Sequence, residues 1–344
     1  MPSPDPQLRK RETASNFKVP AMNSSVAIVA DIGGTNTRVA LADGKTVRAD
    51  SIRRFSNAEY TGIAPILSQF LKDAGLASVD GACVAAAGPV RDGVAEMTNL
   101  DWTIDADCLT QSTGATQTAI LNDLQAQGHA LGHIAADKLR VITSGPMSHG
   151  AAKLVVGVGT GMNAAPVHET PWGRIVAASE CGHITMPVRS ESDLRLAQFV
   201  ENYGSQSHGF AGVEDVLAGR GLERIYAFVT SEAGAMVELK AADIMAALEK
   251  GEAHARAAAA IYVRILGSEL GNLALIHLPF GGIYIIGGVA RAMTPYLLEM
   301  GFDAAFTDKG RFAEFMQSFA VMVVEDDFAA LTGCAVYLAN GARG

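Results

Sequence analysis

The sequence has little cysteine, and no two of its cysteines stand at the spacing of a metal site. Four of the 344 residues are cysteines, and they are scattered along the chain at Cys83, Cys108, Cys181 and Cys334. Structural zinc sites and disulfide frameworks need cysteines in a closer and more regular arrangement. The sequence therefore argues against both.

Charged residues and long unbroken apolar runs are also scarce. Only 18% of the residues are charged and the net charge is −9, whereas a protein that binds nucleic acid presents a basic face. The most apolar long stretch, residues 257–278, contains Arg264 and Glu269, which predicts a buried helix rather than a membrane span. Residues 1–20 lack the apolar core of a signal peptide. We therefore expect a cytoplasmic protein that binds neither nucleic acid nor a membrane.

The chain is rich in apolar residues and in glycine. Hydrophobic residues make up 49% of the sequence, and most of its 36 glycines stand in short turns between apolar runs. This composition is typical of an α/β protein, and the length is comfortable for two domains. Residues 1–22 are rich in Pro, Ser, Lys and Arg, which predicts a disordered leader.

The most informative stretch is residues 26–43, where two apolar runs flank a polar loop with two glycines at its centre. This pattern predicts a strand, a glycine turn and a second strand. Glycines let backbone N–H groups approach an anion closely, so the turn is suited to phosphate. Asp31, at the end of the first strand, could hold a hydrated Mg²⁺ beside bound phosphates. An ordinary hairpin whose glycines serve only the turn is the alternative.

A second hairpin of the same kind is predicted at residues 153–167. A strand over residues 153–158 leads into the turn Gly159-Thr160-Gly161, and a second strand returns from it. This recurrence predicts two copies of one fold, with a nucleotide in the cleft between them and one phosphate loop from each. We expect a small α/β domain made of residues 23–122 with 325–344, and a large α/β domain made of residues 123–324.

The other apolar patterns complete an α/β architecture. They predict strands over residues 45–55, 81–87, 116–121, 283–286 and 321–324, and helices over residues 60–74, 124–131, 214–230, 253–278 and 329–340. The order of three strands, a helix, a strand, a helix and a strand is that of an RNase H-like domain. The last helix is expected to pack back on the first domain.

Asp123 is the residue that we expect to carry the chemistry. It stands at the carboxyl end of a buried strand, where open α/β sheets bind their ligands. A kinase that acts on an alcohol needs a carboxylate to accept the hydroxyl proton, and the amide of Asn122 could fix a second hydroxyl. From the local sequence alone, a role for Asp123 as the N-cap of the following helix is an equally good interpretation.

Three more polar residues are candidates for sugar recognition. Glu180 and His183 lie around a glycine and together supply the acceptors and donors that a polyol needs, although an isolated pair at this spacing is more often part of an ordinary surface loop. Glu214 stands at the start of a predicted helix, where a glutamate often does no more than complement the helix dipole. Gly287 and Gly288 follow a strand and could let an adenine ring or a ribose lie against the backbone, although such glycines usually serve a turn.

Together these segments resemble bacterial glucokinase, the ATP-dependent hexokinase family of proteobacteria in the actin-like ATPase superfamily. The resemblance runs in order from Val26 to about Asn340. It rests on Asp31-Ile-Gly-Gly-Thr-Asn36, Met97-Thr-Asn99 with Trp102, Leu121-Asn-Asp123, Gly157-Val-Gly-Thr-Gly161, Glu180-x-Gly-His183, Glu214 with Gly219-x-Gly221, and residues 281–288 and 302–312. Each motif alone is modest, but their order along one chain is highly specific.

The resemblance implies two RNase H-like domains, small and large, and transfer of the γ-phosphate of ATP to the 6-hydroxyl of glucose, the entry step of glycolysis. It implies that Asp123 is the base and that Asn122, Asp123, Glu180, His183 and Glu214 bind the sugar. Mg²⁺-ATP is implied at Ala30, Asp31, Ile32, Gly33, Gly34, Thr35, Asn36, Gly159, Thr160, Gly161, Gly287 and Gly288, with Asp31 facing the metal through water. Members of the family are commonly homodimers.

Cys181 departs from the family pattern, in which a glycine commonly stands at this position. A side chain there could narrow or re-aim the sugar site, so a kinase for another hexose, such as mannose or fructose, is one alternative. A sugar-binding regulator without catalysis is the second alternative. The intact Asp123 and the intact first phosphate loop speak against it, because sugar binding alone requires neither.

Overall fold

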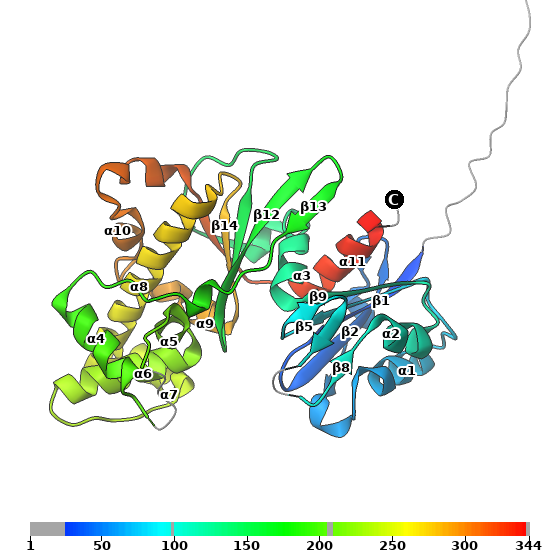
Figure 1. Ribbon diagram of the computed structural model, residues 1–344, viewed down its shortest axis with the longest axis horizontal. Helices are drawn as coiled ribbons and strands as arrows, with labels where there is room; N and C mark the ends of the chain where they lie inside the picture. Colours follow the sequence, from blue (N-terminus) through cyan, green and yellow to red (C-terminus); the bar gives the residue numbers. More distant parts are fainter. Residues whose placement is uncertain (1–24, 98–99, 205–208, 342–344) are drawn as a thin grey trace, which may run out of the picture.

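The computed structural model describes residues 25–97, 100–204 and 209–341. The expected leader over residues 1–22, and Thr98 and Asn99 of the motif after Met97, lie outside these ranges. Figure 1 shows two lobes side by side, with helices α3 (Asp123–Ala130) and α11 (Ala329–Gly341) packed between them. Each lobe is built around its own large sheet.

The sheet of the first lobe has the strand order β3-β2-β1-β5-β9, with β4 (Arg53–Ser56) paired to β2. β1 (Val26–Ile32) and β2 (Asn36–Asp43) form the predicted antiparallel hairpin, which β3 (Thr46–Val47) extends. β5 (Gly81–Ala86) is parallel to β1, and β9 (Gln117–Asn122) is parallel to β5. Every residue of β5 is buried, as expected for a parallel strand with both faces covered.

Helices α1 (Ile63–Asp73) and α2 (Ala106–Thr113) cover one face of this sheet. α1 buries the stripe expected of an amphipathic helix, namely Ile63, Ile66, Leu67, Phe70 and Leu71. Trp102 is buried in the same core, so it serves packing rather than a stacking platform. A small antiparallel sheet adjoins it, formed by β6 (Val90–Arg91), β7 (Val94–Glu96) and β8 (Thr103–Ile104).

The second lobe repeats the plan of the first. Its sheet has the order β10-β15-β14-β11-β12-β13, in which β11 (Lys153–Val158) and β12 (Met162–Thr170) form a hairpin extended by β13 (Gly173–Val176). β14 (Ile283–Ile286) is parallel to β11, and β15 (Val321–Val324) is parallel to β14. The added edge strand is β10 (Leu139–Thr143). The predicted duplication of one α/β fold is therefore confirmed.

The long helix α8 (Ala253–His277) is the centre of the second lobe. By length and composition it could cross a membrane, but 61% of its most apolar window is buried inside the protein, as expected for a core helix. Its Arg264 donates to both carboxylate oxygens of the buried Asp193. The other helices of this lobe are α4 (Glu191–Glu201), α5 (Val213–Leu217), α6 (Gly219–Glu232), α7 (Ala241–Glu249), α9 (Gly288–Met293) and α10 (Phe302–Thr307).

Two helices cross between the lobes. α3 follows β9 of the first sheet but packs on β11 and β12 of the second, whereas α11 follows β15 of the second sheet and packs on β1 and β5 of the first. Where they cross, a Cβ added to Gly333 of α11 would lie 1.7 Å from the carbonyl oxygen of Ala126 in α3. The helices can approach this closely only because position 333 carries no side chain.

The structure corrects two predicted elements and adds others. The strand expected over residues 45–55 is broken into β3, a short 3₁₀ turn and β4. The helix expected over residues 214–230 is two helices, α5 and α6, because Ala218 between them has an extended backbone. α2 and α7, together with the small sheet of β6 to β8, were not predicted.

Candidate active site

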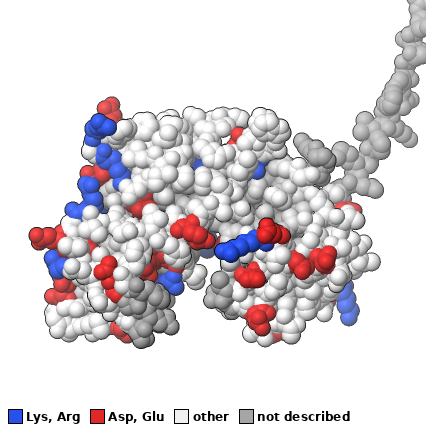
Figure 2. Space-filling view, viewed as in Figure 1, with Lys and Arg blue, Asp and Glu red and all other residues white. Residues whose placement is uncertain are grey.

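The carboxyl ends of the parallel strands bring the candidate residues of the first lobe together. The registers of β1, β5 and β9 place Ile32, Ala86 and Asn122 side by side as the last residues of their strands. The loop after β1 and the start of α3 therefore leave the sheet at one edge. Such an edge is where open α/β sheets bind ligands. Figure 2 shows a deep notch between the two lobes, which forms an interlobe cleft.

The loop between β1 and β2 is a tight turn that the side chain of Asn57 holds in place. The Gly33 N–H donates to the Asn36 carbonyl at 3.0 Å, while Gly34 and Thr35 are exposed. Asn57, which is only 2% exposed, donates from Nδ2 to the Gly33 carbonyl at 2.7 Å and accepts from the Thr37 hydroxyl at 2.8 Å. The buried amide therefore fixes a loop whose tip is free to meet a ligand.

Two other candidates in this segment are core residues. Ala30 and Ile32 have no exposed surface and pack in the core between the sheet and helices α1 and α2. Any contact they make with a nucleotide is consequently limited to the backbone. Asp31, between them on the opposite side of the strand, is only partly buried.

Asp31 and Asp123 form a pair of carboxylates at this edge. Arg38 Nη1 lies 3.3 Å from Asp31 Oδ2. Burial raises the pKa of Asp31, although the Arg38 guanidinium opposes the rise. Burial, with a smaller contribution from the negative charge of Asp31, raises the pKa of Asp123 to about 6, although the hydrogen bond from the Leu124 N–H opposes the rise. An oxygen-rich pair of this kind, with one cationic partner, is suited to a hydrated Mg²⁺.

The structure separates the roles of Asn122 and Asp123. Asn122 is the N-cap of α3: its Oδ1 accepts from the Leu124 N–H at 3.0 Å, and Gln125 completes the capping box. Its Nδ2 donates to the Gly88 carbonyl at 3.0 Å. Asp123 is the first helical residue, and its Oδ1 accepts from the same Leu124 N–H at 2.8 Å. The capping role is thus filled by Asn122.

The glycine loops of the second lobe pack against one another. The Gly159 N–H donates to the Gly161 carbonyl at 2.9 Å, and the Gly219 N–H donates to the Gly159 carbonyl at 2.9 Å. Gly287 has a φ of 110°, and a Cβ added there would lie 2.3 Å from the Val158 carbonyl oxygen. Gly288 beside it is exposed. The structure therefore brings Gly287 and Gly288 next to the turn at Gly159, as one backbone surface.

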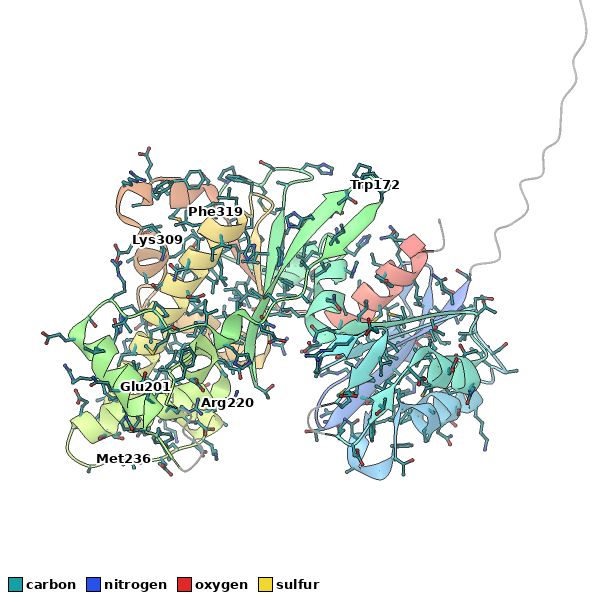
Figure 3. The ribbon with its side chains drawn as sticks, viewed as in Figure 1. Trp172, Glu201, Arg220, Met236, Lys309 and Phe319 are labelled. Atoms are coloured by element: carbon teal, nitrogen blue, oxygen red, sulfur yellow. The ribbon has the colours of Figure 1, made fainter. Side chains whose placement is uncertain are left out.

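Glu180, His183 and Glu214 lie beside this second loop. Glu180 and His183 are exposed: Glu180 directly precedes a 3₁₀ turn over Cys181–His183, and His183 is its last residue. A Cβ added to Gly182 would lie 2.0 Å from the Met162 carbonyl oxygen and 3.3 Å from Glu214 Cβ. Glu214 accepts from the Met162 N–H at 2.9 Å and pairs with Arg220, whose side chain lies on the side of the second lobe that faces the cleft (Figure 3). These three residues therefore gather at the start of β12.

The candidates fall into two groups, one on each lobe. Asp31, Asp123 and the first loop belong to one group, and the second loop with Glu180, His183 and Glu214 belongs to the other. A partly open cavity of about 510 Å³ lies instead between α8 and α10, among residues such as Arg189 and Met300. The candidate polar residues line the interlobe cleft and not this cavity. We therefore take the cleft as the candidate site.

Sequence reasoning missed three residues that organise these loops, namely Asn57, Asn163 and Arg220. Each contacts a candidate residue or its loop. Asn57 lies just after the strand predicted over residues 45–55. Asn163 follows the glycine turn that ends at Gly161, and Arg220 lies between Gly219 and Gly221, so in both places the glycines carried the argument. No local pattern marks them, because their importance comes from contacts across the fold.

The comparisons with known proteins agree with this arrangement. The sequence profile of a family described as Glucokinase matches residues 28–341, which is most of the chain. The chain belongs to the glucokinase family. The glucokinase of Synechocystis sp. is 31% identical, with 91% of this chain and 98% of that protein covered. The glucokinase of Yersinia pestis (strain Pestoides F) is 32% identical, with 92% of this chain and 97% of that protein covered.

A solved structure supports the same conclusion for the fold. The crystal structure of a glucokinase from an Antarctic psychrotroph has a TM-score of 0.81 and 29% sequence identity, with 92% of this chain and 99% of that chain covered. The predicted resemblance to the glucokinase family is therefore confirmed, and so is the two-domain actin-like ATPase fold.

Proposed function

We propose that this member of the glucokinase family transfers the γ-phosphate of ATP to the 6-hydroxyl of glucose, giving glucose 6-phosphate and ADP. The observation that carries the proposal is Asp123. It is a partly buried carboxylate with a pKa near 6, it stands at the edge of the sheet beside the first glycine loop, and it is relieved of the capping role by Asn122. A base of this kind suits phosphoryl transfer from ATP to an alcohol.

We assign the binding of the sugar hydroxyls to residues from both lobes. Asp123 and Asn122 come from the first lobe, and Glu180, His183 and Glu214 come from the second. Because these residues lie on opposite sides of the cleft, a sugar that contacts all of them draws the lobes together. Closure of that kind excludes water and so suppresses hydrolysis of ATP.

We assign the ATP phosphates to the two glycine loops, one from each lobe. The first is the turn held by Asn57 between β1 and β2, and the second is Gly159 to Gly161, with Gly287 and Gly288 beside it for the nucleoside. The described residues contain no cluster of three metal-ligating side chains. The two carboxylates Asp31 and Asp123 fit Mg²⁺, which keeps several waters and binds through one or two carboxylates and the substrate phosphates. Asp31 would hold this ion through water, and the ion would neutralise charge on the phosphates.

The rate of this reaction depends more on how the reacting groups are positioned than on the strength of the base. Asp123 Oδ1 is occupied by the Leu124 N–H, so Oδ2 is the oxygen assigned to take the proton of the 6-hydroxyl. The freed hydroxyl oxygen forms a bond to the γ-phosphorus as the bond from that phosphorus to the bridging oxygen breaks, and ADP leaves. Because this transition state is loose, alignment and charge neutralisation supply most of the rate.

A coupled assay of ADP release with Mg²⁺-ATP tests the proposal. We expect strong ADP release with glucose, weak release with mannose or fructose, and almost none without sugar. A preference for another hexose would assign the enzyme to that sugar and direct attention to Cys181, whose Sγ lies 3.4 Å from Asn163 Oδ1 in the turn before His183. No turnover with any hexose would leave a sugar-binding regulator.

The raised pKa of Asp123 predicts an acid limb in the pH profile. A base with a pKa of about 6 is ionised and active above this pH and is protonated below it. We therefore expect kcat/KM for glucose to fall about tenfold between pH 7 and pH 5. The measurement is a pH–rate profile, with the fold followed by circular dichroism at each pH as the control. A profile that stays flat to about pH 4.5 would contradict the assignment.

We also propose a cytoplasmic homodimer that takes neither nucleic acid nor a membrane as partner. Support comes from the net charge of −9 and from the resemblance stated above. Light scattering on the purified protein tests the dimer directly: a mass of one chain at working concentration would reject it.

A further inference from the structure

We propose that Asn163 is a positioning residue of the sugar site, whose side-chain amide sets the orientation of Glu180 and of the turn that follows it. This inference rests on the proposed function. Asn163 is the second residue of β12, two positions after Gly161, so it lies between the second phosphate loop and the segment with the sugar candidates.

Both ends of the Asn163 amide bind this segment. The Oδ1 atom accepts from the Cys181 N–H at 3.1 Å and from the Ala164 N–H at 2.8 Å, and the Cys181 thiol lies 3.4 Å away. The Nδ2 atom donates to the Ser179 carbonyl and faces Glu180 Oε2 at 3.4 Å. One side chain thus contacts three consecutive residues, 179 to 181, that end in the sugar loop.

Only an amide has the chemistry that this position demands. Backbone N–H groups on one side require an acceptor, while the Ser179 carbonyl and the Glu180 carboxylate on the other side require a donor. Asn carries an oxygen and an NH₂ group at the same branch point, whereas Asp has acceptors alone when ionised. The partners also fix which way the amide points, because a flipped amide would oppose donor to donor and acceptor to acceptor.

The turn has little freedom to move independently of Asn163. Gly182 lies so close to the Met162 carbonyl oxygen that no Cβ fits between them, and Glu214 Cβ is packed against the same glycine position. A change in β12 at Asn163 would consequently be passed on to the turn and to Glu180 and His183 at its two ends.

The phosphate loop next to Asn163 is held by other contacts. Gly159 is bonded to Gly161 within the turn and to Gly219 of α6. These bonds are between backbone atoms and do not involve the Asn163 side chain. A positioning role in the sugar site therefore predicts a change in KM for glucose without a matching change in KM for ATP.

The experiment compares Asn163→Asp and Asn163→Ala with the wild-type chain. Asn163→Asp keeps the shape and the acceptors but sets a second carboxylate against Glu180, so we expect KM for glucose to rise on the order of 10- to 100-fold. Asn163→Ala removes the donor and leaves the Cys181 N–H unpaired, so we expect a rise of about tenfold. KM for ATP should stay within about threefold in both, because its loop keeps its own bonds.

Asn202→Asp is the matched control. Asn202 is exposed at the end of α4, where its Nδ2 donates to the Gln198 carbonyl at 2.7 Å, so the same exchange of an amide for a carboxylate is made outside the sugar turn. We expect KM for glucose within about twofold of the wild type. If Asn202→Asp raised this KM as much as Asn163→Asp does, the effect would come from the added negative charge and not from the contacts of Asn163.

The outcomes separate this inference from the proposed function. A wild-type chain without glucose kinase activity would overturn the function itself. An active wild type with an unchanged KM for glucose in Asn163→Asp, or with KM for ATP rising in parallel, would overturn the inference alone. Tm is recorded for every variant, and if Asn163→Asp does not fold, Asn163→Ala decides by the same two constants.

Discussion

Replacing Asp123 by asparagine is expected to lower kcat with glucose by about 10²- to 10⁴-fold, the contribution typical of a positioned general base. Asparagine has the same shape, and its Oδ1 can still accept from the Leu124 N–H, so the start of α3 and the cleft should be preserved. KM for glucose should change little, because the other sugar contacts remain. Steady-state kinetics and calorimetric glucose binding measure the two effects separately.

The same substitution should make the fold slightly more stable at neutral pH. The pKa of Asp123 is raised in the folded chain to about 6, so its contribution to stability is fully present at low pH and is lost as the pH rises through that value. A neutral amide removes the unfavourable buried charge. Asp107→Asn, an exposed change in α2, is the control for both measurements. Turnover of Asp123→Asn near the wild-type rate would rule out the base.

The second large effect is expected at the crossing of α3 and α11. In Gly333→Ala the new methyl group would meet the Ala126 carbonyl oxygen at 1.7 Å, and this oxygen belongs to a helix backbone that cannot turn away. Overpacking a core typically costs about 1–3 kcal/mol, and a backbone obstacle places this site at the upper end or beyond. For a chain of this size a cost of about 3 kcal/mol or more is expected to lower Tm by roughly 4 °C or more.

Asn340→Ala is the matched control for Gly333→Ala. Asn340 is exposed near the end of the same helix, so this change should leave Tm within about 1 °C. Differential scanning calorimetry measures both variants. If Gly333→Ala melted with the wild type, the two helices would have room that the observed crossing does not show.

The parts of the fold that sequence could predict are those coded locally. The hairpin of β1 and β2 joins an apolar run, a glycine turn and a second apolar run within 18 residues. The hairpin of β11 and β12 repeats this signal, which is why the duplication was readable. The place of Asp123 just after a strand was likewise predictable, although in β9 only Leu121 is buried and not the whole strand, as had been predicted. The freedom of Asp123 from capping was not predictable, since Asn122 and Asp123 are equally good caps in sequence.

The parts that sequence could not predict depend on contacts between distant segments. Asn57 supports the first glycine loop from 24 residues away, and Asn163 reaches residues 179 to 181 across a hairpin. The strands β6 to β8 have only two or three residues each, too few to show a period of two. In the sequence, Cys181 is a single departure from the family pattern, whereas in the structure its thiol contacts Asn163, a side chain of β12.

The position of α11 has a consequence for the chain during its synthesis. The sheet face that this helix covers is lined by small side chains of β1, β2 and β5, complete by residue 86, with Leu121 of β9 beside them. The helix ends at residue 341, about 220 residues after β9. At about 5–20 residues per second, a ribosome needs roughly 10–45 s to supply it. During that time the nascent first lobe exposes an apolar surface that α11 does not yet cover. This lobe can complete its fold only when the second lobe has been translated.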